Sequence, residues 1–328
     1  PLGDGHYRFT ANSTLTDRAG GALDGDGDGT GGDPYQRIFD VSLPAGYVFE
    51  GTRNDVRQAA TALPLEEDPP GGGYLLGRGL GSIQPGGDPD WWSFEVLAGD
   101  VISVAVDTRG SDMSPSVSLF DAGGDRLDYD WGDGPGYDAF ISHQRIQSGG
   151  TCYMEVVDGS TGAYELRVDV AREVQLESDG GYANDNISGA DVLSLTEGGP
   201  DLQVATVAGT LMAGDAGEGV DDDVFALGTL SAGNDVELGS AHPGASTFVG
   251  RLSLVDASGS EVTDEDGDSL DGHFLGTVPS HGQYFPKVES LWSPGGNLYR
   301  ATDLDVTSTS WPEAEARAVD LGGHLVTI

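Results

Sequence analysis

The stretch GGDPDWWSFEV, Gly86 to Val96, decides the fold of this chain. Two carboxylates one residue apart, Asp88 and Asp90, lead into two adjacent tryptophans and then into an alternation of apolar and polar residues. Alternation with a period of two residues is typical of a β-strand that has one buried face. The stretch therefore predicts a strand that begins beside an acidic turn.

Other runs in the first half of the chain have the same character. They are rich in Val, Phe and Tyr, they alternate with polar residues, and clusters of Gly, Asp, Pro and Ser separate them. The runs are WSFEV (92–96), VISVAV (101–106), SVSLF (116–120), CYMEV (152–156) and YELRV (164–168). Short strands at this spacing predict an all-β sandwich.

The chain also repeats itself. NDVRQAATALPLEE from Asn54 aligns with NDNISGADVLSLTE from Asn184, with identical residues at both ends of the alignment. Further matches follow in the same order: VSLFDAGG from Val117 with LSLVDASG from Leu252, IQSGGTCYMEV from Ile146 with VPSHGQYFPKV from Val278, and YELRVDV from Tyr164 with YRATDLDV from Tyr299. We infer a tandem duplication, in which each copy is long enough for one sandwich core.

Charge excludes two classes of partner. The formal net charge is −40, and Lys287 is the only lysine. Phosphate backbones and anionic headgroups are repelled by such a surface, so we expect no nucleic acid partner. No apolar run approaches the roughly 20 residues of a membrane span, so we expect no membrane insertion. Cations are the partners that this composition favours.

The order of the repeated blocks resembles the bacterial pre-peptidase C-terminal domain, a jelly-roll-like β-sandwich found in secreted peptidases and other exported proteins. In the first copy, residues 50–171, the resemblance rests on DxDWWSF, SLFDAGG, SGGTCYMEV and TGAYELRV. In the second copy, residues 177–306, VDDDVFAL from Val220 stands in place of the tryptophan pair. The resemblance implies tandem jelly-roll-like β-sandwiches.

Calcium is the cofactor that the acidic turn predicts. On an extended chain, residues i and i+2 face the same way, so Asp88 and Asp90 can converge on one ion, and oxygen ligands suit Ca²⁺. The resemblance implies two sites, made of Asn54, Asp55, Asp88 and Asp90 in the first copy and of Asn184, Asp185, Asp221 and Asp223 in the second. The family also places a Glu two residues before the Asn, whereas Glu50 and Glu177 lie further ahead and are left out of the predicted sites. A solvated turn before a strand is the alternative interpretation.

The tryptophan pair is a candidate ligand-binding feature. Because successive side chains of a strand point to opposite faces, one of Trp91 and Trp92 should fill the core and the other should lie on the surface. The surface tryptophan could anchor a sugar or a polypeptide. A surface tryptophan covered by a neighbouring loop is the alternative.

The two ends of the chain resemble other families. Residues 1–43, with the motif DRAGGALDG, resemble the C-terminal part of a bacterial Ig-like domain. Residues 309–328, TSWPEAEARAVDLGGHLVTI, are similar to the first helix and following strand of a C-type lectin-like domain. The expected fold class is therefore all-β, with a short α/β fragment at the C-terminal end.

Catalytic motifs are missing from the sequence. HExxH, GxSxG and paired-Cys patterns do not occur, so we expect no enzyme activity. The predicted function is a non-catalytic, calcium-binding adhesion and spacer segment of a large secreted or cell-surface bacterial protein. It would be monomeric within a longer multidomain chain and bind an extracellular polysaccharide or protein. The alternative is a set of accessory domains of a secreted peptidase or glycoside hydrolase whose catalytic domain lies elsewhere.

Overall fold

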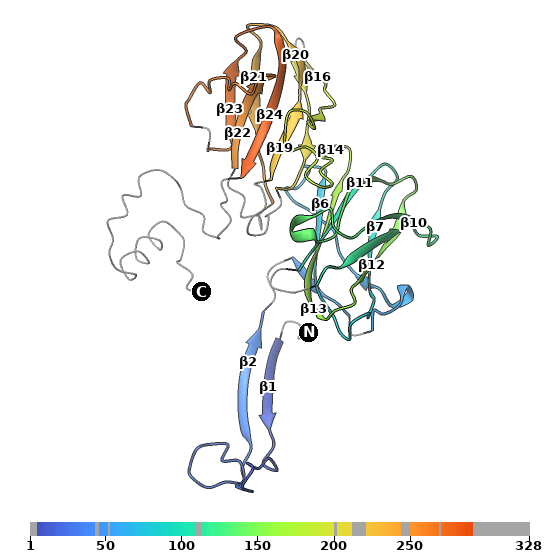
Figure 1. Ribbon diagram of the computed structural model, residues 1–328, viewed down its shortest axis with the longest axis vertical. Coiled ribbons are helices and arrows are strands. Elements are labelled where there is room, and N and C mark those ends of the chain that lie inside the picture. Colours follow the sequence, from blue (N-terminus) through green and yellow to red (C-terminus); the bar gives the residue numbers. More distant parts are fainter. Residues whose placement is uncertain are drawn as a thin grey trace, which may run out of the picture. The chain divides into compact units, whose positions relative to one another are not determined.

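The computed structural model describes residues 5–42, 46–51, 53–108, 113–199, 202–211, 221–243, 250–268 and 270–290. Over these residues the chain is built from strands, turns and two short 3-10 helices, with no α-helix, which confirms the predicted all-β class (Figure 1). The chain divides into two compact units between Leu176 and Glu177. The helix and strand predicted for residues 309–328 lie outside the described residues.

The first unit is a sandwich of two sheets, with strand orders β10-β9-β12-β7-β4 and β11-β8-β13-β6-β3, and with β5 also paired to β6. Every strand expected from the sequence is present. The strands are β3 (Tyr47–Phe49), β4 (Thr61–Ala62), β5 (Glu66–Glu67), β6 (Tyr74–Ile83), β7 (Asp90–Val96), β8 (Val101–Asp107), β9 (Ser116–Phe120), β10 (Arg126–Asp130), β11 (Phe140–Arg145), β12 (Gly150–Val157), β13 (Gly162–Ala171) and β14 (Gln175–Leu176). Before them, β1 (Gly5–Ala11) and β2 (Tyr35–Val41) form a hairpin of their own.

Trp92 is the largest fully buried side chain of this sandwich core. It lies over β6, where three successive core-facing positions are the glycines Gly77, Gly79 and Gly81. A Cβ atom on Gly79 would lie 2.7 Å from the Trp92 ring, and a Cβ atom on Gly81 would lie 2.2 Å from the Tyr164 ring. The glycines therefore make room for two large aromatic side chains between the sheets.

Substituting Gly79 with alanine should therefore destabilise the first unit. The added methyl group would force the Trp92 ring or the β6 backbone to move, and overpacking of this kind costs about 1–3 kcal/mol. Thermal unfolding followed by circular dichroism measures the effect. Gly159→Ala is the matched control, because a Cβ atom at Gly159 meets nothing within 4 Å. Equal melting temperatures for the two variants would contradict this account of β6.

The second unit contains a sheet of order β15-β19-β24-β20, with β22 also paired to β24, and a two-stranded sheet of β21 and β23. Its core includes Leu252, Leu254, Phe274 and Tyr284. The strands are β15 (Asp191–Val192), β16 (Thr196–Gly199), β17 (Leu202–Val204), β18 (Val207–Ala208), β19 (Asp222–Ala226), β20 (Gly228–Leu230), β21 (Asp235–Gly239), β22 (Gly250–Asp256), β23 (His273–Thr277) and β24 (Gly282–Ser290).

Equivalent main-chain hydrogen bonds recur in the two units at the positions that the sequence alignment pairs. The DAGG and DASG turns are both closed by a glycine N–H, from Gly124 to Asp121 O at 3.0 Å and from Gly259 to Asp256 O at 2.9 Å. The residues four positions before β12 and β24 also make equivalent bonds: Ile146 N donates to Asp100 O and Val278 N donates to Asn234 O, each at 2.8 Å. The last matched block, from Tyr299, lies outside the described residues.

Candidate metal centres

In the first unit, the segment before β4 is clamped against the entry of β7. The two strands run parallel, with Thr61 opposite Trp92. The N–H of Trp91 donates to the main-chain O of Asn54 at 2.8 Å, and Leu63 N donates to Ser93 O at 2.8 Å. This clamp brings the Asn-Asp pair next to the two aspartates that precede the strand.

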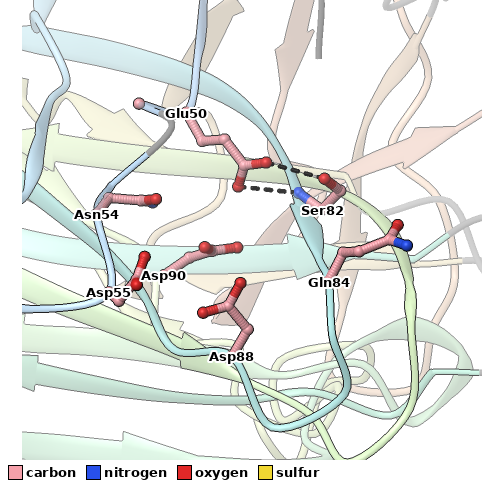
Figure 2. Close-up of a pocket in the computed structure, with 8 residues that line it drawn as sticks. Glu50, Asn54, Asp55, Ser82, Gln84, Asp88 and Asp90 are labelled. Atoms are coloured by element: carbon pink, nitrogen blue, oxygen red, sulfur yellow. Dashed lines mark hydrogen bonds between the residues drawn. The ribbon is translucent and has the colours of Figure 1, made fainter.

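The side chains at this clamp face a common space. Figure 2 shows the carboxylates of Glu50, Asp55, Asp88 and Asp90 pointing toward one another, with Asn54 beside them. Glu50 accepts hydrogen bonds from Ser82 N at 3.0 Å and from Ser82 Oγ at 2.8 Å. Both Asn54 and Asp90 are buried. We call the set of Glu50, Asn54, Asp55, Asp88 and Asp90 the first acidic cluster.

Crowding changes the acidity of this cluster. Burial raises the pKa of Asp90 to about 8, and the hydrogen bond and negative charge of Glu50 add to that shift. Burial also raises the pKa of Asp88, together with the charges of Asp55 and Glu50. Without a cation, the cluster therefore favours holding protons near neutral pH.

A chain of hydrogen bonds connects the cluster to the hydrophobic core. Trp92 Nε1 donates to the hydroxyl of Tyr164 at 2.9 Å, and that hydroxyl donates to Asp90 Oδ2 at 2.9 Å. The tryptophan that fills the core thus orients the tyrosine that holds the carboxylate. The acid and the indole of the DPDWW stretch are therefore connected. Through Tyr164, the indole of Trp92 fixes the position of the Asp90 carboxylate.

The second unit has the same clamp. Val224 N donates to the main-chain O of Asn184 at 3.0 Å, and β15 runs parallel to β19 as β4 does to β7. Carboxylate oxygens of Asp179, Asp221 and Asp223 lie within 4.8 Å of one another. The second acidic cluster comprises Glu177, Asp179, Asn184, Asp185, Asp221 and Asp223, and all but Asp185 are at most 3% exposed.

A buried amide oxygen of the second cluster receives no hydrogen bond from the described residues. Asn184 donates through Nδ2 to Asp223 Oδ1 at 3.2 Å, but its own Oδ1 receives no hydrogen bond from the described residues, although Asn184 is 0% exposed. A buried acceptor without a donor costs roughly 1–3 kcal/mol. An ion that accepts electron pairs from oxygen would satisfy this atom.

The pKa values of carboxyl groups in the second cluster are raised as well. Burial, followed by the charge of Asp223, raises the pKa of Glu177 well above its usual value. Burial and the charges of Asp223 and Asp185 raise the pKa of Asp179 to about 7. Burial raises the pKa of Asp223 to about 6, although hydrogen bonds with Glu177 and Asn184 oppose the shift. Several ionised carboxylates cannot share this interior without a compensating cation or protons.

Both donor sets fit calcium. They consist of carboxylate and amide oxygens, the ligands that Ca²⁺ takes at about 2.3–2.6 Å, and contain no His or Cys. The unsatisfied Oδ1 of Asn184 is an oxygen of the same kind. On the chemistry of the donors, Asn54, Asp55, Asp88 and Asp90 would hold one ion, and Asn184, Asp185, Asp221 and Asp223 would hold another.

The structure places the predicted residues in two groups of four and adds others that sequence reasoning missed. Glu50 and Glu177 belong to the clusters although they lie further from the Asn than the family pattern requires. Asp179 was missed, although Glu177 and Asp179 repeat the i, i+2 spacing of Asp88 and Asp90. Ser82, near the end of the glycine-rich strand β6, and Gln84, just after it, also line the first cluster and carry no signal in the sequence.

The two tryptophans separate as the alternation predicts. Trp92 is 0% exposed and cannot contact a ligand at the surface. Trp91 is partly buried on the opposite face, where its ring packs against Phe120 with the centroids 5.2 Å apart. Only Trp91 remains a candidate for ligand binding.

Comparisons with known proteins found no matching family model and no matching curated protein. Among solved structures, the periplasmic g-type lysozyme inhibitor PliG of Aeromonas hydrophila is 16% identical, covering 34% of this chain and 96% of its own, with a TM-score of 0.26. The pre-peptidase C-terminal domain of a Bacillus anthracis collagenase is 21% identical, covering 33% and 93%, with a TM-score of 0.23.

A third solved structure spans more of this chain. The CBM22-1-CBM22-2 tandem domain of Paenibacillus barcinonensis Xyn10C is 13% identical and covers 74% of this chain and 94% of its own, with a TM-score of 0.18. TM-scores this low carry no argument about function. Among the described residues, no helix has the length and apolarity to span a membrane.

Proposed function

We propose that this chain is a non-catalytic, calcium-binding spacer and adhesion segment of a secreted or cell-surface protein. Each unit would hold one Ca²⁺ at its acidic cluster. The observation that carries the proposal is the recurrence of one construction: a main-chain clamp onto an Asn, at 2.8 Å in the first unit and 3.0 Å in the second, beside converging carboxylates.

The clamp explains what the ion would do for the fold. The segments that carry Asn54 and Asn184 pair with their sheets through only two residues each, in β4 and β15. Calcium, when bound, supplies the positive charge that lets the carboxylates approach one another. The chain's own residues then fasten an N-terminal segment to a core strand in each unit, so that each sandwich stays closed.

The acidic composition of the chain and the calcium concentration outside cells are consistent with an extracellular role. Millimolar calcium is found outside cells, where sites of extracellular modules bind with dissociation constants of about 10⁻⁴ to 10⁻³ M. A net charge of −40 also requires counterions to limit self-repulsion. Linked weak sites in such a chain gain avidity for a polymer without any single tight contact.

Calorimetric titration of calcium into the metal-stripped chain tests the proposal. We expect saturable binding of one ion per unit, because each cluster gathers several carboxylate oxygens and an amide side chain. Asp90→Asn should remove the site of the first unit and Asp223→Asn the site of the second. Asp125→Asn is the matched control, since this aspartate is exposed and outside both clusters. Absence of saturable binding, or an unchanged stoichiometry in both cluster variants, would overturn the proposal.

A further inference from the structure

Aromatic side chains cross the outer face of one sheet of the first unit. The register places Trp91 opposite Glu155, Glu155 opposite Ser118, and Ser118 opposite Tyr129, in one row over β7, β12, β9 and β10. Trp91 and Tyr129 therefore lie on the same face. Phe120 packs against Trp91 from the next row, while Glu155 and Ser118 lie between Trp91 and Tyr129, so aromatic and polar side chains share this face up to the edge strand, β10.

The exposure of the aromatic rings is greatest at that edge. Tyr129 on β10 is 45% exposed, and the loop after β10 presents Trp131 at 65% and Tyr137 at 72%. Within the described residues, Trp131 is the only tryptophan among the strongly exposed large side chains. We call Tyr129, Trp131 and Tyr137 the edge aromatic group.

The loop that carries this group is held in place from both ends. Asp130 Oδ2 accepts from the main-chain N–H groups of Gly132 at 2.9 Å, Asp133 at 3.1 Å and Phe140 at 2.8 Å. At the other end, Asp138 accepts from Thr108 N at 2.7 Å and Thr108 Oγ1 at 2.6 Å. Such anchoring holds the main chain of the loop in place, so less conformational entropy is lost when its side chains bind a partner.

The backbone conformation of Tyr137 is unfavourable for a residue with a side chain. Its φ angle of 63° lies in the left-handed region, which costs a non-glycine residue about 1–2 kcal/mol. Since the side chain is largely exposed, packing does not repay this cost. A strained and exposed aromatic residue on an anchored loop is better explained by a contact with a partner.

The edge itself offers little for strand addition. The N–H of Tyr129 is taken by its neighbour Asp128 Oδ1 at 2.8 Å, and Asp130 takes the next main-chain donors along the chain. A partner strand would have to displace these bonds before it could pair with β10. Recognition here must therefore come from side chains.

Charge selects the class of partner. From Arg126 to Tyr137 the sequence contains Asp128, Asp130 and Asp133, with Arg126 as the only basic residue. Arg126 already shows the preferred contact, with its guanidinium carbon 5.3 Å from the centroid of the Tyr129 ring. Aromatic faces flanked by carboxylates attract cationic side chains through cation–π and ion-pair interactions.

We propose that the edge aromatic group is a docking site for arginine- or lysine-bearing segments of an extracellular polypeptide. Trp131 and Tyr137 receive the cationic side chains, and Asp128 and Asp133 pair with their charge. The inference rests on the proposed function, because it names the partner class and the contact surface of the adhesion role. It does not require either acidic cluster.

Fluorescence anisotropy of a labelled peptide of alternating arginine and glycine, titrated with the full chain in calcium-containing buffer, tests the inference. At about 0.15 M salt, attraction between distant exposed charges is largely screened. We expect saturable binding that Trp131→Ala and Tyr137→Ala each weaken about three- to tenfold, since each loses a cation–π contact. A peptide with citrulline in place of arginine should not bind.

Neither variant changes the net charge, so nonspecific attraction of the peptide stays constant. Phe9→Ala is the matched control, because Phe9 is an exposed aromatic residue of the β1–β2 hairpin, and its variant should bind like the original chain. Trp131→Phe keeps a ring and should restore part of the affinity, and melting curves check that all variants are folded.

Three results would overturn the inference: no binding of the arginine peptide, equal binding by all variants, or binding of cellohexaose that depends on Trp131 in place of peptide binding. The last result would assign the surface to a polysaccharide. Calcium titration of the same samples separates the two proposals. If calcium binds but the peptide does not, the docking site alone is rejected. If calcium does not bind but the peptide binds in a way that depends on Trp131, only the calcium sites are rejected.

Discussion

Replacing Trp92 with alanine is expected to lower the free energy of unfolding of the first unit by about 3–5 kcal/mol. The side chain is fully buried at the centre of the core, where its ring lies over Gly79. Because Gly77, Gly79 and Gly81 of β6 have no side chains that could move into the space, the cavity should persist. At about 4 °C per kcal/mol, the melting temperature should fall by about 12–20 °C.

The Trp92→Ala substitution should also weaken the hydrogen bonds that hold the first acidic cluster. Without the indole N–H, the Tyr164 hydroxyl loses a donor in the core, and Asp90 is held by a tyrosine that has lost its own support. Calcium affinity of the first unit should therefore fall together with its stability. Trp92→Phe separates the two effects, because it keeps most of the ring volume but removes the hydrogen bond.

Trp91→Ala is the control for this prediction. It makes the same chemical change one position away, on the partly buried outer face, and should cost at most about 1.5 kcal/mol. Calorimetric unfolding of the three variants, compared with the original chain, measures the differences. If Trp91→Ala and Trp92→Ala were equally destabilising, the assignment of Trp92 to the core and of Trp91 to the surface would be wrong.

Without calcium, the chain should become less stable as the pH rises from 5 to about 8. Asp90, Asp179 and Asp223 have native pKa values of about 8, 7 and 6, above the value near 4 of an unfolded carboxyl. Between those values the native state binds more protons than the unfolded state, so the free energy of unfolding falls with rising pH. The slope is about 1.4 kcal/mol per pH unit for each such carboxyl.

Calcium should abolish most of this dependence. An ion at each cluster replaces the protons, so binding should release protons near neutral pH and the gain in melting temperature should grow with pH. Scanning calorimetry at several pH values, in calcium and in a chelator, measures both effects. The double variant Asp90→Asn, Asp223→Asn should flatten the curve in chelator, whereas Asp125→Asn should not. A chelated protein whose stability rose between pH 5 and 8 would contradict the raised pKa values of the two clusters.

Local patterns were enough to predict much of the fold of the first unit. β13 alternates strictly between apolar and polar residues over YELRVDV, and the DAGG and DASG turns need a glycine where the chain reverses, with φ of 93° at Gly124 and 80° at Gly259. β6 could not be found this way, because YLLGRGLGSI has the composition of a loop. Its glycines make sense only when the side chains of Trp92 and Tyr164 are known to cover them.

The clusters were predictable where their residues repeat, and unpredictable where they depend on distant contacts. Asn54 and Asn184 stand out because the chain contains the same segment twice. Glu50 could not be assigned, since its place is set by hydrogen bonds to Ser82 on another strand. The edge aromatic group escaped prediction for a similar reason, because the row from Trp91 to Tyr129 exists only once the strand order β7-β12-β9-β10 is known.

The parallel pairing of β3 with β6 has a mechanical consequence. Tyr47 lies opposite Arg78 and Phe49 opposite Leu80, so β3 enters the sheet from the Tyr74 end of β6, the same end at which β13 leaves through Ala171. Tension applied through both ends of the first unit would thus peel β3 away one bond at a time, which resists little force.

Peeling would stop at Glu50, the first residue beyond β3, which is bound to Ser82 at the far end of β6. Beyond that point, the force would act on all interactions of the first acidic cluster at the same time, whereas the hydrogen bonds of β3 break one after another. In a tethered chain under flow, the proposed calcium ion would therefore set the force at which the first unit lengthens, and the stiffness of the tether would follow the calcium content of the surrounding water.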